Sequence, residues 1–126
     1  MKTLLLVDDE HAIVEALTGI LEDEGYRVVS ASNGREALAR LAEEAPALIL
    51  TDVMMPLMGG RELLAAVRAH PVHARVPVVM MSAVPLAVLQ RGASEPLPFD
   101  AFVQKPFDLG DLLQTVAELA ARTPEG

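Results

Sequence analysis

Two short apolar runs of this 126-residue chain each end in carboxylates. Asp8 and Asp9 follow the run from Leu4 to Val7, and Asp52 follows the run from Ala47 to Thr51. Carboxylates that lie close together repel one another by several kcal/mol at an intermediate dielectric, so either one stays protonated or a cation lies among them. Oxygen ligands suit Mg²⁺, which usually takes one or two carboxylates and a phosphate oxygen. The acids therefore predict a magnesium site if the fold brings the ends of the two runs together.

A hydroxyl and an ammonium group stand at the ends of two further apolar runs. Ser82 follows the run that ends at Met81, and Lys105 follows the run that ends at Gln104. A carboxylate nucleophile, a divalent ion, a lysine and a hydroxyl are together the groups required to move a phosphoryl group onto an acid, because this catalysis is mainly positioning and charge neutralisation. The set predicts phosphoryl transfer to a carboxylate of this protein.

The elements that would position these groups alternate five times between short apolar runs and stretches of helical periodicity. Strands are predicted at residues 3–7, 27–31, 47–51, 77–81 and 101–104. This alternation implies right-handed crossovers and a parallel sheet with helices on both faces. The predicted fold is α/β, a three-layer doubly wound sandwich with a five-stranded parallel sheet of order 2-1-3-4-5, which is flavodoxin-like. Such folds bind ligands beyond the carboxyl ends of the strands, where the strand order reverses.

Apolar stripes and capping residues predict the helices. The first helix should end near Gly25, and the second should begin after Asn33 and stop at Pro46. The third should span residues 60–70, and the last should begin at Asp108. The residues expected to face the core from the first, second and last helices are Ala12, Ile13, Ala16, Leu17, Ile20 and Leu21, then Ala37, Leu38 and Leu41, then Leu109, Leu112, Leu113, Val116, Ala117 and Ala120.

The segment between the fourth and fifth predicted strands departs from this pattern. Residues 84–98 contain Pro85, Gly92, Pro96 and Pro98. Proline removes a backbone donor and clashes with the preceding turn, so we expect at most a short helix near residues 86–91, followed by loop. The predicted fourth helix is thus shortened or irregular.

The composition limits the functions that the chain can have. Its net charge of −8 disfavours direct binding of nucleic acid, because lysine and arginine supply most of the affinity for a phosphate backbone. The absence of cysteine excludes disulfides and thiolate sites. The first apolar run stops at Asp8, and no run approaches the roughly eighteen apolar residues of a membrane span. We therefore expect a cytoplasmic protein with one domain over residues 1–122, and a tail or the start of a linker at residues 123–126.

Four short motifs give the chain a resemblance to response regulator receiver domains of two-component signalling, over essentially its whole length. The motifs are Val7-Asp8-Asp9-Glu10, Thr51-Asp52-Val53-Met54-Met55-Pro56 with Gly59-Gly60, Met81-Ser82-Ala83, and Lys105-Pro106-Phe107. Each motif alone is weak, but their order, spacing and placement at strand ends are together highly specific. The resemblance implies a phosphoprotein that assists its own phosphorylation and dephosphorylation but does not turn over a separate substrate.

The resemblance also implies a role for each residue of the site. Asp52 would accept a phosphoryl group from the phosphohistidine of a sensor histidine kinase or a phosphotransfer protein. Asp8, Asp9 and the backbone carbonyl of Met54 would hold Mg²⁺ together with Asp52, with Asp9 as the more direct ligand and Mn²⁺ as an acceptable substitute. Lys105 would pair with Asp52 and later with a phosphoryl oxygen.

A conformational change would then carry the signal. Ser82 would turn toward the phosphoryl group, and Phe102 would swing inward into the space that Ser82 leaves. The Lys105-Pro106 peptide bond would be cis, although an X-Pro bond has only about a 5% prior chance of this. The output would be an unknown effector or a homodimer formed on phosphorylation, through a surface that the irregular fourth helix makes atypical.

Two positions beside the site predict the lifetime of the phosphoryl group. Met54 and Val84 stand two residues beyond Asp52 and Ser82, at positions that in the family tune the attack of water. Neither side chain can orient a water molecule, so slow self-dephosphorylation is expected.

Other residues with ligand-forming side chains are interpreted more simply. Met54, Met55 and Met58 lie in a loop and are interpreted as hydrophobic fillers rather than a soft-metal site. His70 and His73 are not expected to bind metal, because a proline and a loop lie between them.

The residues taken singly leave other interpretations open. Asp8 and Asp9 could merely cap a helix, and Asp52 could be a turn residue. A phosphatase of the haloacid-dehalogenase type would need a second acid two residues after its nucleophile, where Met54 stands. A flavodoxin-like nucleotide binder would need N–H groups rather than acids after the first strand. A receiver that binds partners without phosphorylation would keep the fold but not the chemistry.

Overall fold

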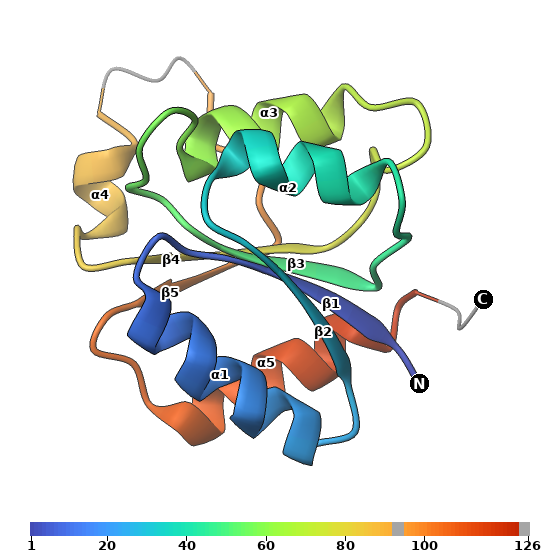
Figure 1. Cartoon of the computed structure of the whole chain (residues 1–126). Coiled ribbons are helices and arrows are strands. Elements are labelled where there is room, and N and C mark those ends of the chain that lie inside the picture. Colours follow the sequence, from blue (N-terminus) through green and yellow to red (C-terminus); the bar gives the residue numbers. More distant parts are fainter. Residues whose placement is uncertain (92–94, 124–126) are drawn as a thin grey trace.

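A single parallel sheet of order β2-β1-β3-β4-β5 forms the centre of the molecule (Figure 1). The computed structural model describes residues 1–91 and 95–123. Within that part of the chain the strands are β1 Thr3–Val7, β2 Arg27–Ala31, β3 Leu48–Asp52, β4 Val78–Ser82 and β5 Ala101–Gln104. The predicted strand order is confirmed. β3 and β4 begin and end one residue later than predicted, so Asp52 and Ser82 are the last residues of their strands.

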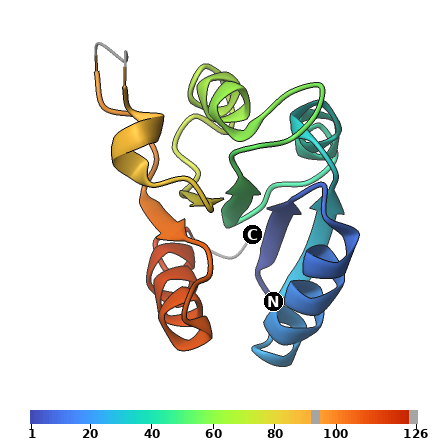
Figure 2. The same ribbon diagram turned by 90° about the vertical axis from the view of Figure 1, so that its left-hand side faces the viewer.

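Helices cover both faces of this sheet. In the described ranges they are α1 His11–Asp23, α2 Gly34–Leu41, α3 Gly60–Arg68, α4 Leu86–Leu89 and α5 Leu109–Ala120. α1 and α5 lie on one face, α2 and α3 lie on the other, and α4 lies near β5 (Figure 1 and Figure 2). The predicted three-layer sandwich is therefore confirmed. Among the described residues we find no helix with the length and apolar character needed to traverse a lipid bilayer.

Alternate side chains of the central strands point to opposite faces and build two apolar clusters. On one face, Leu5 of β1 and Ile49 of β3 pack with Leu63 of α3. On the other face, Leu6 of β1 packs with Leu112 of α5. Both faces of these strands are buried, which explains why their sequences are continuous apolar runs. Each buried leucine or isoleucine stabilises the fold by about 1.5–3 kcal/mol, and this packing holds the strand ends in fixed relative positions.

The inward faces of α1 and α5 differ in part from the prediction. Ala12 and Ala16 of α1 are exposed, and so are Leu109 and Ala117 of α5, whereas Leu119 is buried. Alanine has too little apolar surface to mark a face, and an apolar stripe predicts the buried face only to within about one residue on either side. Leu109 stands at the first position of its helix, where the chain has just left a loop.

The predicted helix starts agree with the structure, whereas α2 and α3 end earlier than predicted, α3 by two residues at Arg68. The Oδ1 atoms of Asn33 and Asp108 each accept a hydrogen bond from the N–H three residues on, at 2.9 and 3.0 Å. Gly25 follows α1 with φ +95°, as expected of a C-terminal cap. α2 ends before Pro46 is reached, because Ala42 and Glu43 already form a turn.

The segment between β4 and β5 holds only a short helix, as predicted. α4 is four residues long, and residues 95–100 are not helical. Gly92, which was expected to help break the helix, lies outside the described residues. β5 pairs with β4 alone and is the edge strand of the sheet. α5 lies beside one face of this strand, and only the short α4 lies near the other (Figure 2).

Candidate functional site

The polar residues that were expected to meet lie together at the carboxyl edge of the sheet. Asp8 follows β1, Asp52 ends β3, Ser82 ends β4, and Lys105 follows β5. β1 and β3 are neighbours in the sheet but not in the sequence, and such a reversal of strand order is where open α/β sheets bind ligands. A pocket of about 260 Å³ at this position is lined by Asp9, Glu10, Asp52, Met54, Ser82, Ala83, Val84 and Lys105.

Three carboxylates converge here. One carboxylate oxygen from each of Asp8, Asp9 and Asp52 lies within 4.8 Å of the other two. Asp8 and Asp52 are buried, with 1% and 7% of their surfaces exposed, whereas Asp9 is exposed. Across residues 1–91 and 95–123, this is the one group of three or more acids, histidines or cysteines that could hold a metal ion. An all-oxygen set with one member facing solvent fits Mg²⁺, which keeps several of its waters.

Backbone N–H groups orient the two buried acids. The N–H of Glu10 donates to Asp8 Oδ1 at 2.9 Å, and the N–H of Val53 donates to Asp52 Oδ1 at 3.0 Å. The donors belong to the backbone just beyond the ends of β1 and β3, so the orientation of both carboxylates is tied to those strand ends. Each acid keeps its second oxygen for other contacts in the pocket.

Lys105 brings a positive charge between the buried acids. Its Nζ donates to Asp8 Oδ2 at 3.2 Å and lies 3.5 Å from Asp52 Oδ1. The resemblance implied a pairing with Asp52, and the structure adds a shorter contact with Asp8. The two acids stand at the ends of adjacent strands, so one ammonium can reach both. The Lys105-Pro106 peptide bond is cis, as the resemblance implied.

The pocket makes Asp52 a weaker acid than usual. Burial raises the pKa of Asp52 and the charge of Asp8 raises it further, against the opposing effects of Lys105 and the Val53 N–H. Burial lowers the pKa of Lys105, but its hydrogen bond to Asp8 and the charges of Asp52 and Asp8 outweigh this and raise its pKa overall. Lys105 therefore stays cationic, and the acids still outnumber it. A divalent cation would relieve the remaining repulsion.

Ser82 and Phe102 occupy the positions expected for a switch. Ser82 is buried in the pocket wall, and its Oγ accepts a hydrogen bond from the Val84 N–H at 2.9 Å. Phe102 is half-buried against the core cluster on the α3 face, with its ring centroid 6.1 Å from that of Phe99. Phe102 thus has exposed surface that an inward movement would bury.

The three methionines of the loop between β3 and α3 lie in different environments. Met55 packs against the core, and Met58 lies against Gly34, so both fill space as predicted. Met54 is 64% exposed and lines the pocket, so the interpretation as a filler is wrong for this residue. Met54 follows soon after the strand end, where the chain has already left the core and borders the pocket.

Gly60, which belongs to the Gly59-Gly60 motif of the sequence, sets the path of this loop. The Gly60 N–H donates to Val53 O at 2.9 Å. A side chain at Gly60 would overlap the backbone carbonyl oxygen of Asp52. α3 can therefore begin directly against the end of β3 only because this residue is glycine, and the close contact anchors the backbone that carries Asp52.

His70 and His73 serve the turn between α3 and β4. Their ring centroids are 4.6 Å apart. His70 Nδ1 accepts hydrogen bonds from the N–H groups of Val72 and His73 at 3.0 and 3.3 Å, and His73 Nε2 lies 3.0 Å from Leu41 O. The His70 imidazole thus holds the backbone of this turn, and the His73 imidazole joins the turn to the end of α2.

Comparison with known protein families decides where the chain belongs. The family model described as the response regulator receiver domain matches residues 4–117. The chain belongs to the response regulator receiver domain family. Its fold and the placement of its acids, serine and lysine at the strand ends agree with that assignment.

Individual relatives resemble this receiver domain over almost its full length. Response regulator Rre1 of Synechocystis sp. is 37% identical over 121 residues, which are 95% of this chain and 52% of that protein. The solved structure of the chemotaxis response regulator CheY4 of Vibrio cholerae has a TM-score of 0.84 at 32% identity, covering 94% of this chain and 98% of its own. Response regulator TrrA of Thermotoga maritima, solved with Mg²⁺-BeF, has a TM-score of 0.82 at 30% identity, covering 94% and 99%. The receiver domain spans about half the length of several curated relatives that it matches.

Proposed function

We propose that this receiver domain is the phosphoacceptor switch of a two-component phosphorelay. Asp52 would accept a phosphoryl group from the phosphohistidine of a sensor histidine kinase or a phosphotransfer protein, in a reaction that depends on Mg²⁺. The environment of Asp52 supports this best. The Asp52 carboxylate borders a pocket. One of its oxygens lies within 4.8 Å of an oxygen from each of Asp8 and Asp9, and its Oδ1 lies 3.5 Å from the Lys105 Nζ.

The residues of the pocket can carry this transfer. A carboxylate oxygen of Asp52 attacks phosphorus while the phosphorus–nitrogen bond of the phosphohistidine breaks, and the imidazole nitrogen leaves with the electron pair. The Val53 N–H holds the plane of the carboxylate during the attack. The Lys105 ammonium neutralises charge that spreads over the phosphoryl oxygens. The transfer changes the state of the protein itself, so no separate substrate is turned over.

The metal ligands in this proposal are Asp8, Asp9, Asp52 and the backbone carbonyl of Met54. When bound, Mg²⁺ supplies positive charge that offsets the repulsion among the acids and the incoming phosphoryl oxygens. Asp9 is the exposed member of the set, so it can meet a hydrated ion directly. The Mg²⁺-BeF present in the related TrrA structure supports this choice of metal. Mn²⁺ should substitute, because the same oxygen ligands suit it.

Phosphorylation would change the binding surface near α4 and β5. Ser82 Oγ would leave the Val84 N–H and turn toward the phosphoryl group, and Phe102 would move into the space that opens. Because α4 is four residues long, this surface differs from one built on a full helix, and we propose an atypical output. The effector would be another domain, another protein or a second copy of this chain, bound in the cytoplasm without contact of this domain to nucleic acid or membrane.

Mass spectrometry of the intact chain after incubation with acetyl phosphate and Mg²⁺ tests the proposal. The wild type should gain one phosphoryl adduct, and Asp52→Asn or treatment with EDTA should prevent it. An unlabelled wild type would contradict the proposal and indicate a receiver that binds partners without phosphorylation. Repeated hydrolysis of a phosphate monoester would indicate a phosphatase instead, and binding of flavin would indicate a flavodoxin-like function.

A further inference from the structure

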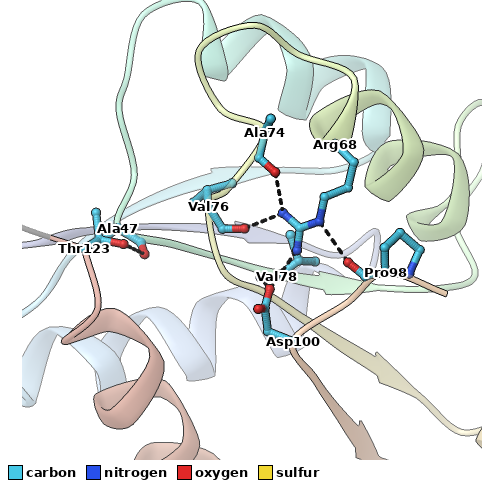
Figure 3. A network of polar contacts seen from close by, with 8 residues as sticks. All are labelled: Ala47, Arg68, Ala74, Val76, Val78, Pro98, Asp100 and Thr123. Carbon is cyan, nitrogen blue, oxygen red and sulfur yellow. Dashed lines mark hydrogen bonds and ion pairs between the residues drawn. The ribbon is translucent and has the colours of Figure 1, made fainter. Parts of the chain in front are cut away.

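One arginine side chain joins the end of α3 to the segments that lead into β4 and β5 (Figure 3). Arg68 Nε donates to Pro98 O at 2.8 Å, and Nη1 donates to Val76 O at 2.6 Å and to Ala74 O at 3.2 Å. Nη2 forms an ion pair with Asp100 Oδ2 at 2.7 Å. Four acceptors therefore converge on one guanidinium group, whose side chain is 21% exposed.

Asp100 extends this network into the sheet. Its N–H donates to Val78 O at 2.9 Å, and the Val78 N–H donates back to Asp100 Oδ2 at 2.8 Å. The same carboxylate oxygen thus accepts from the backbone of β4 and from Arg68. These bonds stand just before the first strand pair, Val79 with Ala101. They join the amino end of β5, a strand of only four residues, to the start of β4.

The carboxyl end of the same strand delivers Lys105 to the pocket. The Lys105 N–H donates to Ser82 O at 2.8 Å, and Nζ reaches Asp8 and Asp52 at 3.2 and 3.5 Å. A slip of β5 by one residue would displace Lys105 by roughly 3.3 Å and turn its side chain to the other face of the sheet. That displacement is as large as the separations between Nζ and the two acids, so both contacts would be lost.

We propose that Arg68 and Asp100 are positioning residues for the phosphoryl transfer proposed above, on which this inference rests. They fix the register of β5 and so hold the Lys105 ammonium beside Asp8 and Asp52. β5 is an edge strand. Its Ala101 and Val103 pack against the core cluster that includes Leu112 and Val116 of α5, whereas only the four-residue α4 lies near its other face, so side-chain bonds at its amino end add to incomplete packing. Hydrogen bonds between charged partners are roughly twice as strong as neutral ones, and this pair is partly buried, which limits screening by solvent.

The test compares initial rates of labelling by acetyl phosphate at saturating Mg²⁺, at a temperature where every variant is folded. Asp100→Ala removes the ion pair and the bond from Val78, and should slow labelling by on the order of ten- to a hundred-fold, the cost of displacing a catalytic group by about 1 Å. Asp100→Asn keeps an oxygen acceptor and should restore most of the rate. The matched control is Glu44→Ala, which removes the two bonds between Arg27 and Glu44 at the opposite edge of the sheet and should leave the rate unchanged.

A double-mutant cycle separates positioning from a general loss of stability. In a Lys105→Met background, whose slower labelling is followed over longer times, Asp100→Ala should cause no further slowing, because Lys105 is the group through which it acts. If Asp100→Ala does not fold, Arg68→Lys, which cannot make all four bonds, takes its place in the cycle.

Three outcomes would count against the inference. A wild-type rate for Asp100→Ala, or equal slowing in the presence and absence of Lys105, would overturn it and leave the phosphoacceptor function intact. A wild type that takes no label would overturn the proposed function, and this inference with it.

Discussion

The convergence of Asp8, Asp9 and Asp52 predicts that the chain gains stability when one of these charges is removed. Burial and the charge of Asp8 raise the pKa of Asp52, so the ionised carboxylate is disfavoured in the folded state. Asp52→Asn removes the charge but keeps an oxygen for the Val53 N–H. We therefore expect this variant to have a larger free energy of unfolding than the wild type when no divalent cation is present.

Coulomb's law sets the size of the effect. At an effective dielectric of about 20, two unit charges 4.8 Å apart, the upper limit for one oxygen from each acid, repel by roughly 3.5 kcal/mol. The attraction between Asp52 and Lys105 at 3.5 Å is roughly 4.7 kcal/mol on the same basis. The attraction exceeds the repulsion from one neighbouring acid by roughly 1.2 kcal/mol, and the cost of burying the carboxylate outweighs this difference, because burial is the main cause of the raised pKa of Asp52. The expected gain is about 1–2 kcal/mol, or a rise of about 0.5–1 M in the urea midpoint for a slope of about 2 kcal/mol/M.

Urea unfolding followed by circular dichroism measures this gain, first in EDTA and then with Mg²⁺. At ten times its dissociation constant, Mg²⁺ should stabilise the wild type by about 1.4 kcal/mol and stabilise Asp52→Asn less, so the two curves converge. Glu15→Gln removes an exposed charge of α1 and should change stability by less than about 0.5 kcal/mol. If Asp52→Asn gains no more than this control in EDTA, burial and the neighbouring acid do not disfavour the charged form of Asp52, contrary to the raised pKa.

The dependence on pH follows from the same pKa shift. The folded-state pKa of Asp52 lies above its ordinary value of 3.8. The contribution of Asp52 to stability is therefore most favourable at a pH below its pKa in the unfolded chain. That contribution is lost as the pH rises through its pKa in the folded chain. The advantage of Asp52→Asn should be largest near neutral pH and should shrink on acidification. An advantage that grows as the pH falls would contradict the assigned direction of the shift.

Three further predictions concern the loop and the pocket. In urea unfolding, Gly60→Ala should lower the free energy of unfolding by about 2–4 kcal/mol, because the added methyl group overlaps a backbone oxygen. The control Gly19→Ala, where the added methyl group meets open space on α1, should raise the free energy of unfolding by up to about 1 kcal/mol. The asparagine of Met54→Asn can orient a water molecule, so this variant should lose its phosphoryl label faster than the wild type, on the order of tenfold. The prediction fails if the wild type already loses its label rapidly and polar substitutions at Met54 or Val84 do not change that rate. Ser82→Ala should slow labelling roughly ten- to a hundred-fold without weakening Mg²⁺ affinity, measured by titration.

The placement of the site was predictable because it depends on the strand ends. β1, β3 and β4 are buried on both faces, so each appears in the sequence as a continuous apolar run whose last residues mark the carboxyl edge of the sheet. The positions of Asp8, Asp52 and Ser82 at this edge could be predicted from those runs, although the predicted ends of β3 and β4 were each one residue too early. The short α4 was equally predictable, because proline acts on the backbone directly.

Other features of the site depend on contacts between side chains that are distant in the sequence. The approach of Lys105 to Asp8 as well as Asp52 follows from where three separate strands end relative to one another. The exposure of Met54 follows from the path of a loop, which apolar character alone does not reveal. The bonds of Arg68 to four acceptors could not be predicted either, because none of its partners forms a sequence pattern with it.

β5 links the chemistry of this receiver domain to its surface. Asp100 anchors the strand at one end, Lys105 extends from the other, and Phe102 lies between them with surface still exposed. Ala101 and Val103 of the strand pack against the core cluster that includes α5, whereas only the four-residue α4 lies near its other face. A phosphoryl group that draws on Lys105 would therefore act directly on the carboxyl end of this strand.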